Sequence, residues 1–346
     1  MSTIFSVMTW NLENFFTPGA LSGSSKVISQ ADFDGKLAFV AERILKTKPQ
    51  PDVIAFQELG VRAGEVDHAL LHLQRSLKGK YPHLALSANP DKRGIRVGFL
   101  SKHPLQNLGE VVDFPPGELD EVADWNGKHI GRMGRGALKV EVEPQPGLRV
   151  RLIAAHLKSK LINYPSSGNT TRFAPLNEAE RARGEGLGLL RRTAEAVALR
   201  SYVAGLMELE PAAHTIVLGD LNDEPGAGST QLLLGPADTD ITRADGSDWA
   251  RLYNLGVGLP LRGSEEKYFL RPSERYSRMY QGQGELIDHI LASKGLVWDA
   301  AGANWKVQKV RIFVKANEGQ NVTDNPNLRV GSNAPDHAPV YASFAL

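Results

Sequence analysis

The sequence predicts a layered α/β fold, because short apolar segments typical of strands interleave with longer amphipathic segments typical of helices. The strand candidates are rich in β-branched residues and are bounded by Gly, Pro, Asn or Asp. The two kinds of segment interleave near the N-terminus and again in the middle of the chain. This order favours one layered architecture over separate all-α and all-β domains.

The elements follow in chain order. The predicted strands are Ile4–Trp10, Val53–Phe56, Arg96–Leu100, Ala137–Val142, Val150–Ala155, Thr215–Leu218, Leu286–Leu291 and Pro339–Phe344. The predicted helices are Asp32–Lys46, which stops before Pro49, then Glu65–Leu77 and Glu178–Met207. Three polar stretches, Thr17–Gln30, Ser159–Arg172 and Ala316–Asn333, are predicted as long loops. Each is equally compatible with a lid or binding wall and with a surface insertion.

The composition excludes several classes of function. With 40 basic and 39 acidic residues, the chain lacks the basic excess of proteins that coat nucleic acid, so nucleic-acid binding would require a local basic patch. The absence of cysteine excludes disulfides, thiolate metal sites and thiol nucleophiles. Residues 1–10 lack the pattern of a signal peptide, and no apolar run is long enough to cross a bilayer. The expectation is a cytoplasmic protein without a transmembrane segment.

Polar residues suited to chemistry follow four of the predicted strands. Asn11 follows the first strand, and Gln57-Glu58 follows the second. His156 and the segment Asp220-Leu221-Asn222 follow two later strands. Because ligands bind beyond strand ends in α/β sheets, these groups are expected to converge on one site. Taken singly, each of these residues is more typical of a turn residue or a hydrogen-bonded structural histidine than of a catalytic group; their coincidence favours a shared site.

Two acidic-histidine pairs accompany the remaining strands, namely Asp288-His289 and Asp336-His337. Other catalytic signatures are absent, since the sequence contains no GxxxxGK[ST] loop, no HExxH helix and no GxSxG elbow. The long helix Glu178–Met207 mixes acidic with basic residues, so it is predicted as a packing helix rather than a nucleic-acid reader.

Taken together, these motifs resemble the endonuclease/exonuclease/phosphatase superfamily, also called deoxyribonuclease-I-like. The resemblance rests on Thr9-Trp10-Asn11, Gln57-Glu58, His156-Leu157-Lys158-Ser159, Gly219-Asp220-Leu221-Asn222, Ile287-Asp288-His289-Ile290 and Asp336-His337-Ala338-Pro339. These motifs keep the order of the family and span nearly the whole chain. The resemblance implies a four-layer sandwich of two mixed β-sheets flanked by helices, formed as a single domain over residues 1–346.

The resemblance further implies a divalent-metal site and its ligands. Glu58 resembles the principal carboxylate ligand of Mg²⁺ or Mn²⁺, both of which prefer oxygen donors. Asn11 resembles the neighbouring amide that orients the metal shell or a phosphate oxygen, and Asp336 resembles a further acidic contributor. An ion held there would polarise the phosphoryl oxygen.

Acid–base roles are implied in the same way. Asp220 resembles the residue that positions and deprotonates the attacking water, and Asn222 would face the same side if the segment is extended. His337 is expected against the scissile phosphate, either as an imidazolium donor or as the acid/base partner, with Asp288 as its orienting carboxylate. His156 resembles a second histidine that protonates the leaving oxygen.

The resemblance does not supply a partner for His156, and it does not identify which side chains contact the substrate phosphate. Deoxyribonuclease-type members pair this histidine with an upstream glutamate, whereas here Asp91 is the only nearby acid before Arg96. Arg96 itself is equally consistent with a phosphate contact and with a surface arginine. About one or two of six further side chains are expected to contact phosphate: Arg132, Arg135, Lys158, Arg172, Arg275 and Tyr276.

The predicted function is a metal-dependent phosphodiesterase that hydrolyses DNA or RNA through an activated water. The alternatives are a phosphomonoesterase or lipid-headgroup phosphodiesterase, similar to inositol phosphatases or sphingomyelinases, and a catalytically silent binding module. Retention of all the motif residues disfavours the silent module. No obligate protein partner is evident from the sequence.

Overall fold

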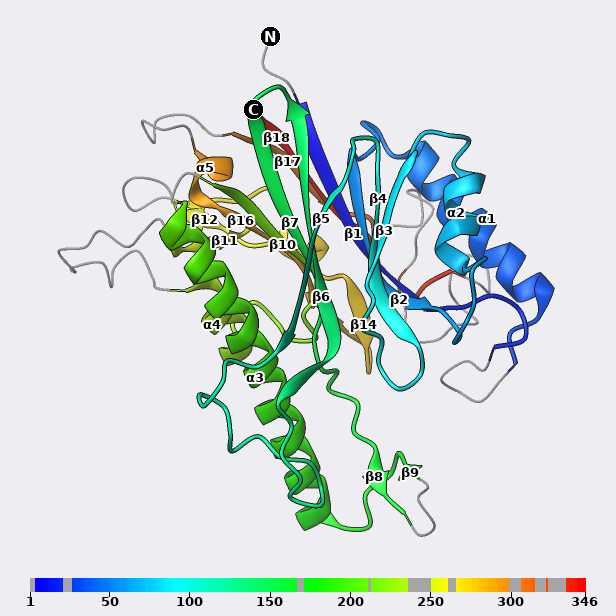
Figure 1. Ribbon diagram of the computed structural model, residues 1–346, viewed down its shortest axis with the longest axis vertical. Helices are drawn as coiled ribbons and strands as arrows, with labels where there is room; N and C mark the ends of the chain where they lie inside the picture. Colours follow the sequence, from blue (N-terminus) through cyan, green and yellow to red (C-terminus); the bar gives the residue numbers. More distant parts are fainter. Residues whose placement is uncertain are drawn as a thin grey trace, which may run out of the picture.

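The computed structural model describes residues 4–20, 27–166, 171–210, 213–235, 250–260, 266–298, 306–314, 322 and 334–346. The predicted loop 316–333 lies outside this part of the chain except for Val322, which is buried. Two six-stranded sheets dominate the described part (Figure 1).

The first sheet joins the N-terminal quarter of the chain to its C-terminal end. Its strands, in spatial order, are β17 (Val307–Ile312), β18 (Val340–Ala345), β1 (Ile4–Phe15), β2 (Val53–Gly60), β4 (Ile95–Ser101) and β3 (His83–Leu86). Only β1 and β2 run parallel; the other neighbours are antiparallel. The sheet is therefore mixed.

The second sheet contains the middle of the chain. Its strands, in spatial order, are β11 (Leu252–Asn254), β16 (Asp288–Ser293), β10 (His214–Asp220), β7 (Leu148–His156), β6 (Arg132–Gln145) and β5 (Gln106–Asp113). Here β7 and β10 are the parallel pair. Their parallel course brings their carboxyl ends to the same edge of the sheet.

Helices cover the outer faces of both sheets (Figure 1). α1 (Gln30–Lys46) and α2 (Ala69–Ser76) cover the first sheet, and α3 (Glu178–Leu209) and α4 (Gly228–Leu234) cover the second. The short helix α5 (Lys294–Val297) packs on the core between the sheets, and a 3₁₀ turn spans Pro272–Glu274. Three two-stranded hairpins complete the described elements: β8 (Tyr164–Pro165) with β9 (Thr171–Arg172), β12 (Leu259–Pro260) with β13 (Glu266–Lys267), and β14 (Arg278–Tyr280) with β15 (Gln283–Glu285). Within the described residues, no helix is both long and apolar enough to cross a bilayer.

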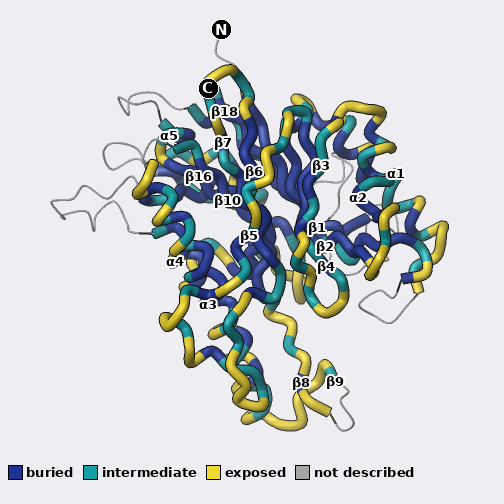
Figure 2. The backbone as a smooth tube through the Cα atoms, viewed as in Figure 1, coloured by how far each residue is buried: buried dark blue, intermediate teal, exposed yellow. Residues whose placement is uncertain are grey.

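Three apolar layers hold these elements together. Between the sheets, side chains such as Val7 and Phe99 pack against Val140 and Ile290 from the opposite sheet. A second layer joins α3 and α4 to the second sheet, and a third joins α1 and α2 to the first. Strand interiors are consequently buried while loops and outer helix faces are exposed (Figure 2). The predicted four-layer sandwich of two mixed sheets is confirmed.

The boundaries differ from the sequence prediction in a few places. Helix α2 begins at Ala69 rather than at Glu65, because the Glu65 carboxylate accepts the Arg62 backbone N–H at 2.8 Å and stabilises a turn. Strands β3, β5, β11 and β17 were not predicted; β5, for example, is polar and largely exposed at the sheet edge. The stretch 159–172, predicted as a loop, contains the short β8–β9 hairpin.

Candidate active site

Polar groups from both sheets meet at one edge of the sandwich. In the second sheet Asp220 is the register partner of His156 on β7 and of Asp288 on β16, so the three residues lie side by side. In the first sheet Asn11 lies beside Gln57. A hydrogen bond of 2.9 Å from Asn11 Nδ2 to Asp220 Oδ2 joins the two sheets at this edge. The strand-end residues of both sheets thus form one cluster.

The end of β10 is shaped by a glycine that no other residue can replace without movement. Gly219 has a φ of +145°, and a Cβ at this position would lie 1.9 Å from the carbonyl oxygen of Ala155 on the neighbouring strand. This close approach of β10 to β7 positions Asp220 beside His156, whose Nε2 lies 3.5 Å from Asp220 Oδ2.

The segment after Asp220 is turned, so the extended conformation on which the expected placement of Asn222 depended is not present. Asn222 has a φ of +54°, and its backbone N–H donates to Asp220 Oδ1 at 2.9 Å, as in an Asx turn. Its side-chain amide donates to the Leu157 carbonyl at 3.0 Å, which ties the end of β10 to the end of β7. Asn222 remains at the site, but by a turn and not by strand alternation.

Glu58 is directed to the site by a bulge in β2. The pairing register with β4 shifts between Phe56 and Leu59, and Glu58 has a φ of +58°. Its carboxylate accepts from the Asn14 backbone N–H at 2.7 Å and lies 3.4 Å from Asn11 Nδ2. Because Asn11 Nδ2 also contacts Asp220, the carboxylates of Glu58 and Asp220 share one amide nitrogen.

His337 and Asp288 form the shortest contact of the cluster. His337 Nδ1 lies 2.6 Å from Asp288 Oδ2, and the Ser277 hydroxyl donates to the same oxygen at 2.7 Å. The Trp10 indole N–H donates to the His337 carbonyl at 2.9 Å and fixes the backbone. Ser277 was not predicted, since a serine eleven residues before Asp288 carries no recognisable signal.

Burial and these contacts set the charges of the site. Burial and the charge of Asp288 raise the pKa of Asp220 to about 7. Burial alone would lower the pKa of His337, but the nearby charges of Asp288 and Asp336 and the hydrogen bond to Asp288 outweigh it and raise that pKa to about 10. At neutral pH the site therefore holds an imidazolium beside a carboxyl group that exchanges protons readily.

A further carboxylate, Glu13, lies beside Asp336. Its Oε2 accepts the Asp336 backbone N–H at 3.1 Å and lies 4.0 Å from the ammonium of Lys36 on α1. Asp336 in turn lies 3.8 Å from His337 Nε2. Sequence reasoning missed Glu13, although its position two residues after Asn11 was a usable signal. Glu13 and Asn14 have φ values of +49° and +54°, so the chain turns sharply as β1 approaches the site.

The donor set fits a hard divalent cation. Carboxylate oxygens of Glu58 and Asp336 and the amide of Asn11 are the ligand types that Mg²⁺ and Mn²⁺ prefer. The ligand atoms of Asp220, Asp288 and His337 also lie within 4.8 Å of one another, and Asp288 Oδ1 is buried without a hydrogen-bond partner. Both groups of donors therefore lie at the same edge of the sandwich, joined through Asn11 and Asp220.

Among the described residues, no upstream carboxylate hydrogen-bonds to the His156 ring. Its Nδ1 is buried without a hydrogen-bond partner, while Arg135 Nη1 lies 3.5 Å from the His156 carbonyl oxygen. Asp91, the one upstream acid, pairs with Arg135 at 3.2 Å and with Arg93 at 3.3 Å. Burial and the charge of Arg135 lower the pKa of His156 well below its usual value, so the ring is neutral at pH 7.

The other predicted substrate contacts have intramolecular partners. Lys158 Nζ donates to the carbonyls of Ser159 and Leu161, and burial with the charge of Arg191 lowers its pKa to about 8. Arg96 donates to the Ser87 carbonyl at 2.9 Å, and Tyr276 packs against the core between the sheets. The remaining arginines bind as follows: Arg132 to Asn89, Arg172 to Glu180, and Arg275 to the Leu270 carbonyl. Among the side chains predicted to contact phosphate, Arg135 contacts a predicted catalytic residue, through the His156 carbonyl oxygen.

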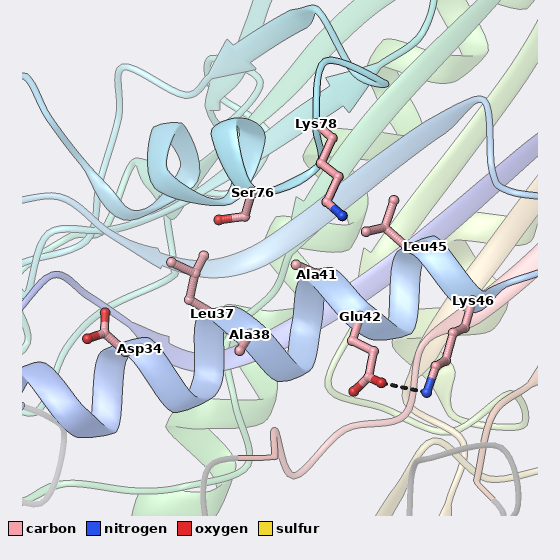
Figure 3. Close-up of a pocket in the computed structure, with 9 residues that line it drawn as sticks. All are labelled: Asp34, Leu37, Ala38, Ala41, Glu42, Leu45, Lys46, Ser76 and Lys78. Carbon is pink, nitrogen blue, oxygen red and sulfur yellow. Dashed lines mark ion pairs between the residues drawn. The ribbon is translucent and has the colours of Figure 1, made fainter.

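A groove of about 590 Å³ elsewhere on the molecule contains none of these groups. It runs along α1 beside the end of α2 and is lined by Leu37, Ala41, Leu45 and Lys78, among others (Figure 3). Its charged lining residues Glu42 and Lys46 pair with each other. The carboxylate–histidine cluster at the sheet edge is therefore the candidate active site.

Two facing mixed sheets flanked by helices define a deoxyribonuclease-I-like fold. The chain belongs to the endonuclease/exonuclease/phosphatase family, whose model matches residues 8–308. It is accordingly a metal-dependent hydrolase of phosphate esters.

Solved structures similar to the chain share its fold. Truncated TDP2 from Caenorhabditis elegans is 17% identical, with a TM-score of 0.51 over 99% of this chain and 98% of that one. A family protein from Bacteroides thetaiotaomicron is 13% identical, with a TM-score of 0.52 over 100% of both chains. A humanized D. rerio TDP2 is 12% identical, with a TM-score of 0.51 over 99% of both. No curated protein matches the sequence closely enough to count as a relative.

Proposed function

We propose that this protein is a phosphodiesterase that hydrolyses DNA or RNA by in-line attack of an activated water. The observation that carries the proposal is the adjacency of Asp220 and His337, whose ligand atoms lie within 4.8 Å, beside the Asn11–Glu58 pair of the facing sheet. A proton acceptor, a cationic donor and a hard-metal donor set in one place are what water-mediated cleavage of a phosphodiester requires.

In this proposal Asp220 accepts the proton of the attacking water, because its pKa of about 7 matches the working pH. His337, held by Asp288, donates to a phosphate oxygen as charge develops there. Glu58, Asn11 and Asp336 would hold Mg²⁺ or Mn²⁺, and such an ion polarises the phosphoryl group when bound. Asn222 holds the base in place through its backbone N–H.

For His156 the proposal departs from the role of leaving-group acid that the family resemblance implied. A neutral ring beside Asp220 is a hydrogen-bonding group for a phosphate oxygen or for the attacking water, and not the cationic acid. The positive charge on this side comes from Arg135 and Lys158, which flank the His156 segment. Arg135 also pairs with Asp91, so the local positive charge that these two side chains offer a phosphodiester is partly compensated.

One observation favours a second candidate, cleavage of a lipid headgroup. Leu161, Phe173 and Leu176 follow the end of β7 in sequence and are 61%, 62% and 77% exposed. Apolar side chains exposed this far in neighbouring loops are typical of contact with a membrane or another surface.

A substrate panel tests both candidates. Purified protein is incubated with plasmid DNA, single-stranded DNA, RNA, a phosphomonoester, an inositol phosphate and sphingolipid vesicles, with chelator or with Mg²⁺ or Mn²⁺, and Glu58→Gln serves as the blank. We expect metal-restored cleavage of the nucleic acids. Cleavage of the vesicles alone would establish the second candidate, and cleavage unaffected by chelator would refute both.

We also propose that the chain is a single domain, because the core between the sheets contains residues from both ends of the chain, from Phe5 to Phe344.

A further inference from the structure

Helix α3 carries two charged residues in the middle of its buried face. Arg192 and Glu195, three residues apart and therefore on the same side of the helix, are 6% and 2% exposed. Their neighbours on this face are small or apolar, including Gly188, Ala196 and Leu199. Burying two charges costs free energy unless each is paired and hydrogen-bonded, so their contacts indicate what they do.

Both residues bind the segment that follows His156. The Glu195 carboxylate accepts the Lys158 backbone N–H at 2.6 Å, and Arg192 Nη1 donates to the Lys158 carbonyl at 3.2 Å. One residue, two positions after His156, is therefore held by both of its backbone polar groups. Glu195 also accepts the Gly134 N–H at 2.9 Å, which fixes the segment to β6.

Arg192 extends the same attachment to the segment that follows Asp220. Its Nε donates to Asp223 Oδ2 at 3.0 Å, and the Ser229 hydroxyl donates to the same oxygen at 2.7 Å. The Asp223 carbonyl lies 2.9 Å from His289 Nε2. The helix thus contacts the ends of β7 and β10, the two strands that deliver His156 and Asp220, and it contacts neither of these side chains directly.

We infer that Arg192 and Glu195 are positioning residues for the reaction: they hold the backbone after His156 and after Asp220 so that the two side chains keep their separation of 3.5 Å. The inference rests on the proposed function for its kinetic consequences. The physical reason is that strand ends are free to move where their ladder stops, whereas a thirty-two-residue helix packed on the sheet is rigid. Charge-assisted bonds, the strongest available, transmit that rigidity to the site.

The attachment reaches one half of the site only. The hydrogen bonds described for Arg192 and Glu195 all end on β6, on the segments after β7 and β10, or on α3 itself. Glu58 and Asn11 belong to β2 and β1 of the other sheet. A positioning role therefore predicts a lower kcat with an unchanged metal concentration for half-maximal rate. Loss of general stability would impair both.

The test is Glu195→Gln, with Glu180→Gln as the matched control. Glu180 lies on the same helix and pairs with Arg172 in its exposed first turns, away from the strand ends. Glutamine at 195 presents an NH₂ group where the carboxylate accepts from Lys158 and Gly134, so one of these bonds is lost. Three quantities are measured in each variant: kcat on the best phosphodiester, the metal concentration for half-maximal rate, and the imidazole NMR signals of His156.

For Glu195→Gln we expect kcat to fall about 10- to 100-fold, as for small misplacements of catalytic groups, with an unchanged metal requirement and shifted His156 signals. Arg192→Lys, which keeps the charge but can make fewer bonds, should show a smaller effect of the same kind. Unshifted His156 signals in Glu195→Gln would overturn the inference, whether or not the enzyme cleaves nucleic acid. A metal requirement raised in parallel with lost turnover would also overturn it. Absence of activity in the wild type, by contrast, would refute the proposed function and leave the NMR result to decide the positioning role.

Discussion

Replacing Asp288 by asparagine removes the charge that keeps His337 protonated. The wild-type pKa of about 10, against an ordinary value of 6.5, corresponds to a preference for the imidazolium of about 5 kcal/mol at roughly 1.4 kcal/mol per pKa unit. Burial acts against this preference, so the nearby acidic groups supply all of it. Asp288 is the nearest of these groups, at 2.6 Å.

In Asp288→Asn the pKa of His337 should fall by about 1–3 units or more, which is the usual effect of losing one close opposite charge. The Asp288 carboxylate oxygen accepts from the Ser277 hydroxyl and contacts His337 Nδ1. Asparagine replaces one carboxylate oxygen by an NH₂ group, so the ring loses its fixed orientation. Turnover at neutral pH should drop by about 10²–10⁴-fold, the range for general acid–base groups.

The assay is the pH dependence of kcat together with an NMR titration of His337. In the wild type we expect the descending limb of the profile near pH 10, and in Asp288→Asn we expect it at a lower pH. Asp34→Asn, an equal change of charge on the exposed face of α1, serves as the control and should leave the limb in place. A descending limb that does not move in Asp288→Asn would refute the reasoning.

Three further outcomes are expected. Asp220→Asn should abolish the ascending limb of the pH–kcat profile near pH 7. Both Asp220→Asn and His337→Ala should lower kcat about 10²-fold or more, and a wild-type rate in either variant would contradict the role of that residue. Glu58→Gln should raise the metal concentration for half-maximal activity, measured by titrating Mg²⁺ into chelator-treated enzyme, and an unchanged midpoint would argue against its ligation. Gly219→Ala should destabilise the fold by about 1–3 kcal/mol in urea unfolding, because its Cβ would meet the Ala155 carbonyl at 1.9 Å; an unchanged midpoint would show that β7 and β10 separate easily.

The strand ends were predictable because their signals are local. An apolar β-branched run that stops at Asn11, Glu58, His156 or Asp220 places a polar group at a sheet edge, whatever the rest of the chain does. The family resemblance added the four-layer arrangement and the pairing of the last two acidic-histidine motifs. Asn222 shows the limit of such reasoning, because its expected placement depended on an extended segment and the chain turns there.

Other residues of the site have no local signal. The role of Ser277 is seen only from its hydrogen bond to the Asp288 carboxylate. The role of Glu195 is seen only from its bonds to the backbone N–H groups of Lys158 and Gly134, which are 37 and 61 residues away. The same holds for the protonation of the histidines, which depends on the burial of each ring and on the charges near it.

The sequence by itself therefore determined the α/β class, the main strands and helices and the identity of the chemical groups at the strand ends, because periodicity and termination are properties of neighbouring residues. Only the tertiary structure decided which groups touch, which are charged and what holds them still. Contacts between sheets, burial and electrostatic fields depend on distance in space, and residues such as Asn11 and Asp220, 209 positions apart, become neighbours only when the two sheets pack.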